Sequence, residues 1–157
     1  MGETEKEAVA LEEMHKELDL IQGCITRMAQ NSFMIKGWVI GILAAMIAIA
    51  GDRIPARELG WISMAILLAF WALDAFFLKM EKCYRFKYEW VIDVRPKGNR
   101  NSLYDLNPYK TETRKGGVKT PGVLCVMFSR PFTLLMFYGI PFLIAVAAIV
   151  MNPSWKP

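Results

Sequence analysis

The sequence predicts an all-α membrane protein with three transmembrane helices, of which the first two extend into a cytoplasmic helical hairpin. Three long apolar runs support this fold: Phe33 to Ala50, Trp61 to Leu78 and Phe132 to Met151. Each is close to the roughly 20 residues that a helix needs to cross a bilayer. Charged residues make up 22% of the 157-residue chain and lie almost entirely between these runs. Helices of a soluble domain keep one polar face, which these runs lack.

The apolar runs and the charged stretches divide the chain into eight expected segments. They are a cytoplasmic amphipathic helix (1–32), transmembrane helix 1 (33–50), an outer turn (51–60), transmembrane helix 2 (61–78), a cytoplasmic helix extension (79–95), a basic cytoplasmic loop with an interfacial segment (96–131), transmembrane helix 3 (132–151) and an outer tail (152–157).

The distribution of basic residues predicts the orientation. The link between the first two spans holds only Arg53 and Arg57, whereas the stretch from Lys79 to Arg130 carries a dozen Lys and Arg residues. Basic residues near the ends of spans stay on the cytoplasmic side. We therefore expect a protein of the cell's inner (plasma) membrane, with its N-terminus in the cytoplasm and its C-terminus outside.

The N-terminal helix carries an apolar stripe at alternating steps of three and four residues. The stripe consists of Leu11, Met14, Leu18, Ile21, Ile25 and Met28. Such heptad spacing is typical of a helix that packs along another helix. Two interpretations stay open, a coiled coil between copies of the chain and packing on the chain's own later cytoplasmic helix. The helix could also continue without a break into the first span.

The first span contains small residues four positions apart, at Gly37, Gly41 and Ala45. Small residues at this spacing let helix backbones approach closely in lipid. The face could associate with a second copy or receive the second or third span of the same chain, and we favour the intramolecular contact.

Asp74 is the one carboxylate inside an apolar span. A buried carboxylate without a partner costs several kcal/mol, so it needs a counter-ion or a proton. Lys36 lies at nearly the same depth on the first span. We predict an Asp74–Lys36 pair, with Asn31 or Ser32 adding hydrogen bonds. The functional alternative is ion or proton conduction through Asp74.

The second span is expected to run on into the cytoplasm and to end near Val94, because Pro96 and Gly98 follow. Glu81 and Arg85 form an i, i+4 pair on this extension. Its surroundings are basic, whereas the N-terminal helix is acidic. The two helices should therefore pack antiparallel, through surface ion pairs that contribute little stability each but select the pairing. The acidic residues concerned are Glu12, Glu13, Glu17 and Asp19.

After the second helix the sequence predicts a basic loop that contacts lipid headgroups, rich in turn-forming residues. Within it, Val123 to Phe128 is a short apolar stretch that we place at the inner membrane interface. Pro141 should then kink the third span.

The chain lacks the side chains that catalytic or metal sites need. His15 is the only histidine, and the three cysteines, Cys24, Cys83 and Cys125, have no metal-binding or redox spacing. The basic residues next to aromatics around Arg85 are explained by a helix that leaves a membrane, so we expect no nucleic-acid binding. The sequence thus predicts no catalytic residue, no metal and no cofactor.

Two stretches carry a resemblance to known proteins: Ile21 to Trp38 (IQGCITRMAQNSFMIKGW) and Leu73 to Leu78 (LDAFFL). Together they resemble a scattered group of small, uncharacterised prokaryotic three-span membrane proteins, over roughly the first 95 residues. No activity comes with this resemblance. It implies that five residues form one polar cluster at the inner membrane face, namely Arg27, Asn31, Ser32, Lys36 and Asp74.

These observations favour a non-enzymatic integral membrane protein whose cytoplasmic helices bind copies of the chain or a cytoplasmic protein partner. The alternative is an oligomeric pore, a small channel or a membrane-disrupting effector built around the face of Gly37 and Gly41. The lipid bilayer is the one partner that the composition itself demands.

Overall fold

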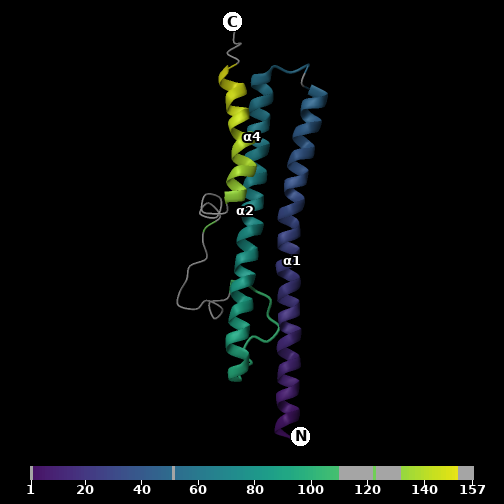
Figure 1. Ribbon diagram of the computed structural model, residues 1–157, viewed down its shortest axis with the longest axis vertical. Coiled ribbons are helices and arrows are strands. Elements are labelled where there is room, and N and C mark those ends of the chain that lie inside the picture. Colours follow the sequence, from purple (N-terminus) through teal and green to yellow (C-terminus); the bar gives the residue numbers. More distant parts are fainter. Residues whose placement is uncertain (1, 51, 110–121, 123–131, 152–157) are drawn as a thin grey trace. The chain divides into compact units, whose positions relative to one another are not determined.

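The protein is all-helical in the part of the chain that the structure describes. The computed structural model describes residues 2–50, 52–109, 122 and 132–151 (Figure 1). These contain α1 (Glu3–Ala50), α2 (Ala56–Val94), the 3₁₀-helix η1 (Arg95–Lys97) and α4 (Phe132–Met151), and no strand. The three α-helices are each long and apolar enough to cross a membrane. This confirms the prediction of an all-α chain with three candidate spans.

The chain forms two compact units, which we describe separately. The charged unit comprises Met1–Gln30 and Leu78–Thr120, and the apolar unit comprises Asn31–Phe77 and Pro121–Pro157. Helix α1 is unbroken from Glu3 to Ala50, so the amphipathic helix and the first span are one element.

The start of α2 differs from the expected one. Helix α2 begins at Ala56, so the turn that was expected over 51–60 is shorter by its last five residues. Pro55 explains the early start, since its ring fixes φ at a helical value just before the first turn. Its carbonyl accepts hydrogen bonds from the amides of Glu58 and Leu59 at 3.0 and 3.1 Å. The end of α2 at Val94 is as predicted.

The core of the charged unit lies between the first half of α1 and the second half of α2. Ile21 and Ile25 of α1 are buried against Trp90 and Val91 of α2. Further side chains surround this centre, namely Met14, Leu18, Tyr84, Tyr88, Val94 and Leu106. The heptad stripe is therefore used within the chain over most of its length. Leu11, at its start, remains 52% exposed.

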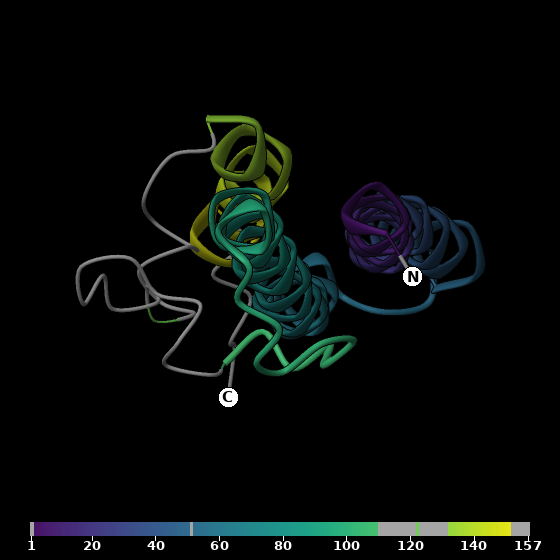
Figure 2. The same cartoon turned by 90° about the horizontal axis from the view of Figure 1, so that it is seen from below.

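In the apolar unit, α4 lies against α2 (Figure 2), and the two helices approach closely at Gly60. A methyl group added at Gly60 would lie 2.7 Å from Cγ1 of Ile149 and 3.0 Å from the carbonyl oxygen of Ala145. Large apolar side chains cover the outside of these helices, for example Leu143 at 67% exposure. Such a surface suits lipid rather than water.

Helix α4 continues through Pro141, which removes one backbone hydrogen bond within it. Three expectations lie outside the described residues: the basic loop beyond residue 109, the interfacial stretch Val123 to Phe128 and the tail 152–157. Cys24 and Cys83 are buried thiols, and Cys125 is not among the described residues.

Candidate functional site

Asp74 is the centre of a buried polar cluster in the apolar unit. Its side chain has no exposed surface, and Nζ of Lys36 lies 2.5 Å from Oδ2. The hydroxyl of Ser32 donates to Oδ1 at 2.5 Å and accepts a hydrogen bond from Lys36 at 2.9 Å. The predicted Asp74–Lys36 pair is confirmed, with Ser32 as the further hydrogen-bond donor. Ser32 and Lys36 can both reach Asp74 because residues four apart share one face of a helix.

Helix α4 adds an aromatic side to this cluster that the sequence did not indicate. Tyr138 is fully buried near the Asp74 carboxylate, and its hydroxyl has no hydrogen-bond partner among the described residues. The Tyr138 ring stacks on Trp71 of α2, with 6.0 Å between ring centroids and 4° between ring planes. The sequence held a signal for Trp71, which precedes Asp74 by three residues and so shares its helix face. Tyr138 had no comparable signal, because the sequence did not indicate which face of α4 packs on the other helices.

Two of the five residues expected in the cluster do not take part. Arg27 belongs to the charged unit, where it donates to the carbonyl of Gly23 and to Sγ of Cys24 within its own turn. Asn31 is half-buried and contributes none of the contacts around Asp74. The reason is rotational: at about 100° per residue, Asn31 lies about 120° and Arg27 about 160° around the helix from the face that Ser32 and Lys36 share.

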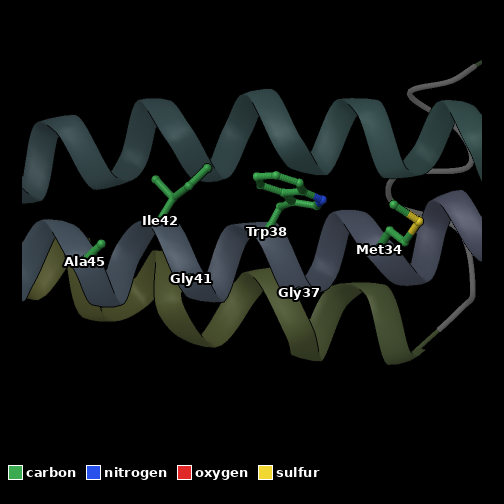
Figure 3. A pocket seen from close by; sticks show the side chains of 6 residues that line it. All are labelled: Met34, Gly37, Trp38, Gly41, Ile42 and Ala45. Carbon is green, nitrogen blue, oxygen red and sulfur yellow. The ribbon is translucent and has the colours of Figure 1, made fainter.

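The small-residue face of α1 is open. Nothing among the described residues comes within 4 Å of a methyl group placed on Gly37 or Gly41. These glycines and Ala45 form a shallow hollow of about 490 Å³ with Met34, Trp38 and Ile42, all on α1 (Figure 3). Our preference for an intramolecular contact here was wrong for the described spans. The second and third helices meet at Gly60 instead.

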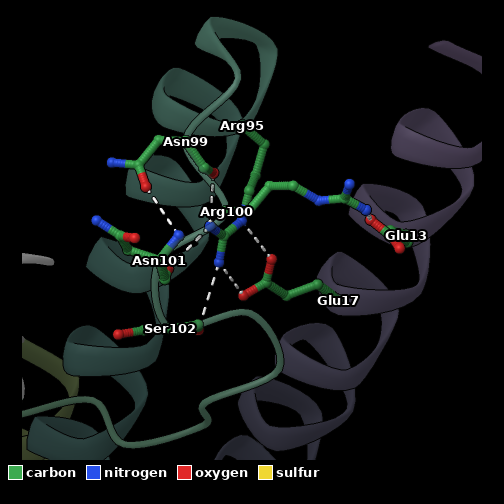
Figure 4. Close-up of polar contacts among 7 residues, drawn as sticks. All are labelled: Glu13, Glu17, Arg95, Asn99, Arg100, Asn101 and Ser102. Atoms are coloured by element: carbon green, nitrogen blue, oxygen red, sulfur yellow. Dashed lines mark hydrogen bonds and ion pairs between the residues drawn. The ribbon is translucent and has the colours of Figure 1, made fainter. Parts of the chain in front are cut away.

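The charged unit contains a second buried ion pair, between Glu17 of α1 and Arg95 of η1 (Figure 4). Glu17 has no exposed side-chain surface and Arg95 has 5%. Nε and Nη2 of Arg95 donate to the two carboxylate oxygens at 2.7 and 2.8 Å, a two-pronged geometry that only arginine provides. We expected surface pairs between these helices, and this pair is buried instead.

Arg95 also holds the loop that follows α2. Its guanidinium donates to the backbone carbonyls of Asn99, Asn101 and Ser102. The Arg95 guanidinium lies 5.3 Å from the centre of the Trp90 ring, within the range of a cation–π contact. Around this centre the exposed Arg100 pairs with Glu13. One arginine therefore connects both helices and the loop.

The loop from residue 98 to 109 is an ordered part of the charged unit. Ser102 and Tyr104 have φ of 56° and 59°, a left-handed conformation that is uncommon for residues other than glycine. Lys87, which is 1% exposed, donates to the carbonyl of Asn107 at 3.1 Å. The Tyr109 hydroxyl lies 2.8 Å from the sulfur of Met80. The part of the predicted basic loop that precedes residue 110 therefore packs on α2.

Tyr84 lies beside Cys24 and Arg27 in the charged unit. Burial, and then the neighbouring Cys24 thiol, raise the pKa of Tyr84 above its ordinary value of 10.0. The phenol therefore stays neutral at physiological pH, as does Tyr109, whose pKa is also raised by burial. Neither tyrosine has the lowered pKa of an activated base.

No family model, curated protein or solved structure matches this chain. Its chemistry is therefore argued from its own residues. Among the described residues, no group of three or more His, Cys, Asp or Glu side chains is placed to hold a metal ion. The two fully buried carboxylates, Asp74 and Glu17, each meet a cation at salt-bridge distance. Such pairs suit a role in fixing structure.

Proposed function

We propose that this chain is an integral membrane protein without catalytic activity, whose charged unit faces the cytoplasm and binds a protein partner. Three apolar helices support insertion, and the dozen basic residues between Lys79 and Arg130 support the orientation. Within this proposal the ion pairs of Asp74 and Glu17 hold the helices in register.

The proposal rests on the first turns of α1, whose described side chains are exposed and lie outside the core of the charged unit. The intramolecular core uses the helix from Met14 onward. The preceding turns have exposed side chains at Glu5 and at every position from Glu7 to Glu12. They combine acidic groups with the exposed apolar side chains of Val9 and Leu11. Leu11 begins the apolar stripe of α1, whereas Val9 lies about 200° around the helix from it. A helix end with an apolar anchor among acidic side chains fits a groove that is apolar inside and basic around its edge.

Site-specific photo-crosslinking in living cells tests this proposal. A photoreactive residue at Leu11 should give a discrete adduct with one other protein. The surface of that protein at the crosslinked site should be basic. The same group at Gln22, which is exposed on a later turn of α1, is the matched control and should give none. The Leu11 adduct should weaken when Glu7 and Glu12 are both changed to Gln. Equal labelling at Leu11 and Gln22, or no adduct at either position, would contradict the proposal.

A second candidate function is an oligomer in the membrane, with a pore or membrane disruption as its activity. The open hollow over Gly37 and Gly41 supports it, because helices associate in lipid through such small-residue faces. The variant Gly41→Leu would then lower the oligomer size in detergent and abolish ion flux in liposomes. The matched variant Gly23→Leu, also free of neighbours within 4 Å but outside the apolar unit, should change neither. A monomeric wild type without flux would remove this candidate.

A further inference from the structure

The apolar unit contains a second hollow, partly open and lined by residues of all three helices, to which nothing above assigns a role. Its volume is about 310 Å³. Leu43 and Ile47 of α1, Leu59 and Gly60 of α2, and Ala145 and Ala148 of α4 are among its lining residues. The hollow is widened by small side chains on two of the helices.

The side chains that line the hollow offer hydrocarbon contacts and no unused hydrogen-bond donor. Ser63 is the one hydroxyl-bearing residue in it, and this hydroxyl already donates to the carbonyl of Leu59 at 2.8 Å. Water does not fill a cavity without polar partners. An empty hollow would also forfeit the dispersion contacts of its walls. An aliphatic chain satisfies both conditions.

The dimensions indicate which aliphatic chain this is. Along α2 the hollow extends from Ala56, in the first turn, to Leu67. Eleven residues at about 1.5 Å each give about 16 Å. That length is about half of the roughly 30 Å hydrocarbon core, which is the depth of one leaflet. The hollow thus has the length of one acyl chain.

Charged side chains of both signs flank the end of the hollow that lies at Ala56, in the first turn of α2. Arg53 and Arg57 are exposed beside Ala56, together with the exposed Asp52 and Glu58. The arginines suit a phosphate and the carboxylates suit an ammonium group. This charge pattern complements a zwitterionic headgroup better than an anionic one.

We propose that the apolar unit binds one phospholipid with a zwitterionic, amine-bearing headgroup, one of whose acyl chains fills the hollow between α1, α2 and α4. The proposal depends on membrane insertion and is independent of partner binding by the charged unit. The bound lipid would serve as part of the packing between α1 and the other two helices.

Native mass spectrometry of the full chain, purified in mild detergent from membranes that contain phosphatidylethanolamine and phosphatidylglycerol, tests the proposal. The wild type should retain one phosphatidylethanolamine per chain. Ala148→Phe fills the hollow and should lower the retained fraction roughly tenfold, the scale on which an apolar pocket discriminates by single methylene groups. Ala147→Phe adds the same ring one position away, on an exposed part of α4, and should retain the lipid.

Further variants separate the headgroup from the acyl chain and guard against misfolding. Arg53→Gln with Arg57→Gln leaves the lining intact and should reduce the preference for phosphatidylethanolamine over a free fatty acid. If Ala148→Phe fails to fold, titration of delipidated wild type with phosphatidylethanolamine replaces it, and melting should rise to saturation at one equivalent. Equal retention by Ala148→Phe and Ala147→Phe would overturn the proposal. The proposal would also be overturned if the wild type is purified without lipid and its melting temperature does not change on titration with phosphatidylethanolamine. Crosslinking of the residues that line the hollow to a second copy of the chain would overturn it as well.

Discussion

Two carboxylates are fully buried in the described part of the chain, and each is paired with a cation from a different helical element. Asp74 of α2 meets Lys36 of α1, and Glu17 of α1 meets Arg95, directly after α2. A buried charge that loses its partner is strongly destabilising, even where the pair itself adds little. Pairs of this kind therefore select one alignment of two helices over its neighbours.

The Asp74–Lys36 pair predicts an asymmetric response to mutation. Lys36→Leu leaves a carboxylate with no exposed surface and without its cation, so unfolding should become easier by about 3 kcal/mol. Asp74→Leu should cost less, because the Lys36 side chain is 21% exposed and its charged end can turn toward water. The double variant should be more stable than Lys36→Leu alone, as measured by thermal melting in detergent. Strictly additive losses would refute the coupling.

Arg95 predicts a difference between arginine and lysine. Arg95→Lys keeps the charge but loses the two-pronged contact with Glu17 and the carbonyl contacts of the loop. We expect a loss of about 2 kcal/mol and faster hydrogen exchange at the amides of Asn101 and Asn107. Arg100→Lys is the matched control, since Arg100 is 60% exposed and should change stability by less than about 1 kcal/mol. Equal effects of the two substitutions would contradict the role of Arg95.

The sequence identifies one of these pairs better than the other for a physical reason. A lone carboxylate in an apolar run demands a partner, and Lys36 was available at the right depth. Glu17 stands among several acidic residues and Arg95 among many basic ones, so nothing in the pattern singles out the pair that becomes buried. The left-handed Ser102 and Tyr104 were equally hidden, because neither residue type favours that conformation.

At the scale of elements, the three helices were predictable because their apolar runs are long and their ends carry clear signals. Proline and glycine after Val94 ended α2 where expected. The packing between helices was less predictable. Two glycines four apart indicated a contact at Gly37 and Gly41, whereas a close approach occurs at Gly60. Ala56 precedes Gly60 by four positions, but both lie before the apolar run that begins at Trp61, so this small-residue pair fell in the expected turn.

This contrast between glycines is testable with a single methyl group. Gly60→Ala places a Cβ 3.0 Å from the backbone oxygen of Ala145, and overpacking of this kind typically costs about 1–3 kcal/mol. Melting in detergent should fall accordingly. Gly37→Ala meets no neighbour within 4 Å and should leave the melting temperature unchanged or higher, since alanine favours a helix. A lower melting temperature for Gly37→Ala than for Gly60→Ala would reverse this assignment.

At the scale of the whole molecule, the positive-inside pattern predicts which side each connection faces. A single cysteine at Asn101, in a variant whose native cysteines are replaced by serine, should react with a membrane-impermeant maleimide only after the cells are opened. A cysteine at Arg53 should react in intact cells, because the short connection is expected outside. Labelling at Asn101 in intact cells would overturn the proposed orientation.

The position of the Asp74 counter-ion in the sequence also affects how the chain can insert into the membrane during translation. Lys36 is translated before Asp74, whereas Tyr138 is translated long after it. When α2 leaves the ribosome, the cation that neutralises its carboxylate is therefore already present on α1. Lys36 and Asp74 are the only charged residues within 33–50 and 61–78, so on the proposed insertion these two runs would enter the bilayer as an electrically neutral pair, without waiting for the third. A nascent chain stopped before residue 132 should accordingly be integrated into the membrane, while the same truncation carrying Lys36→Leu should be integrated less efficiently.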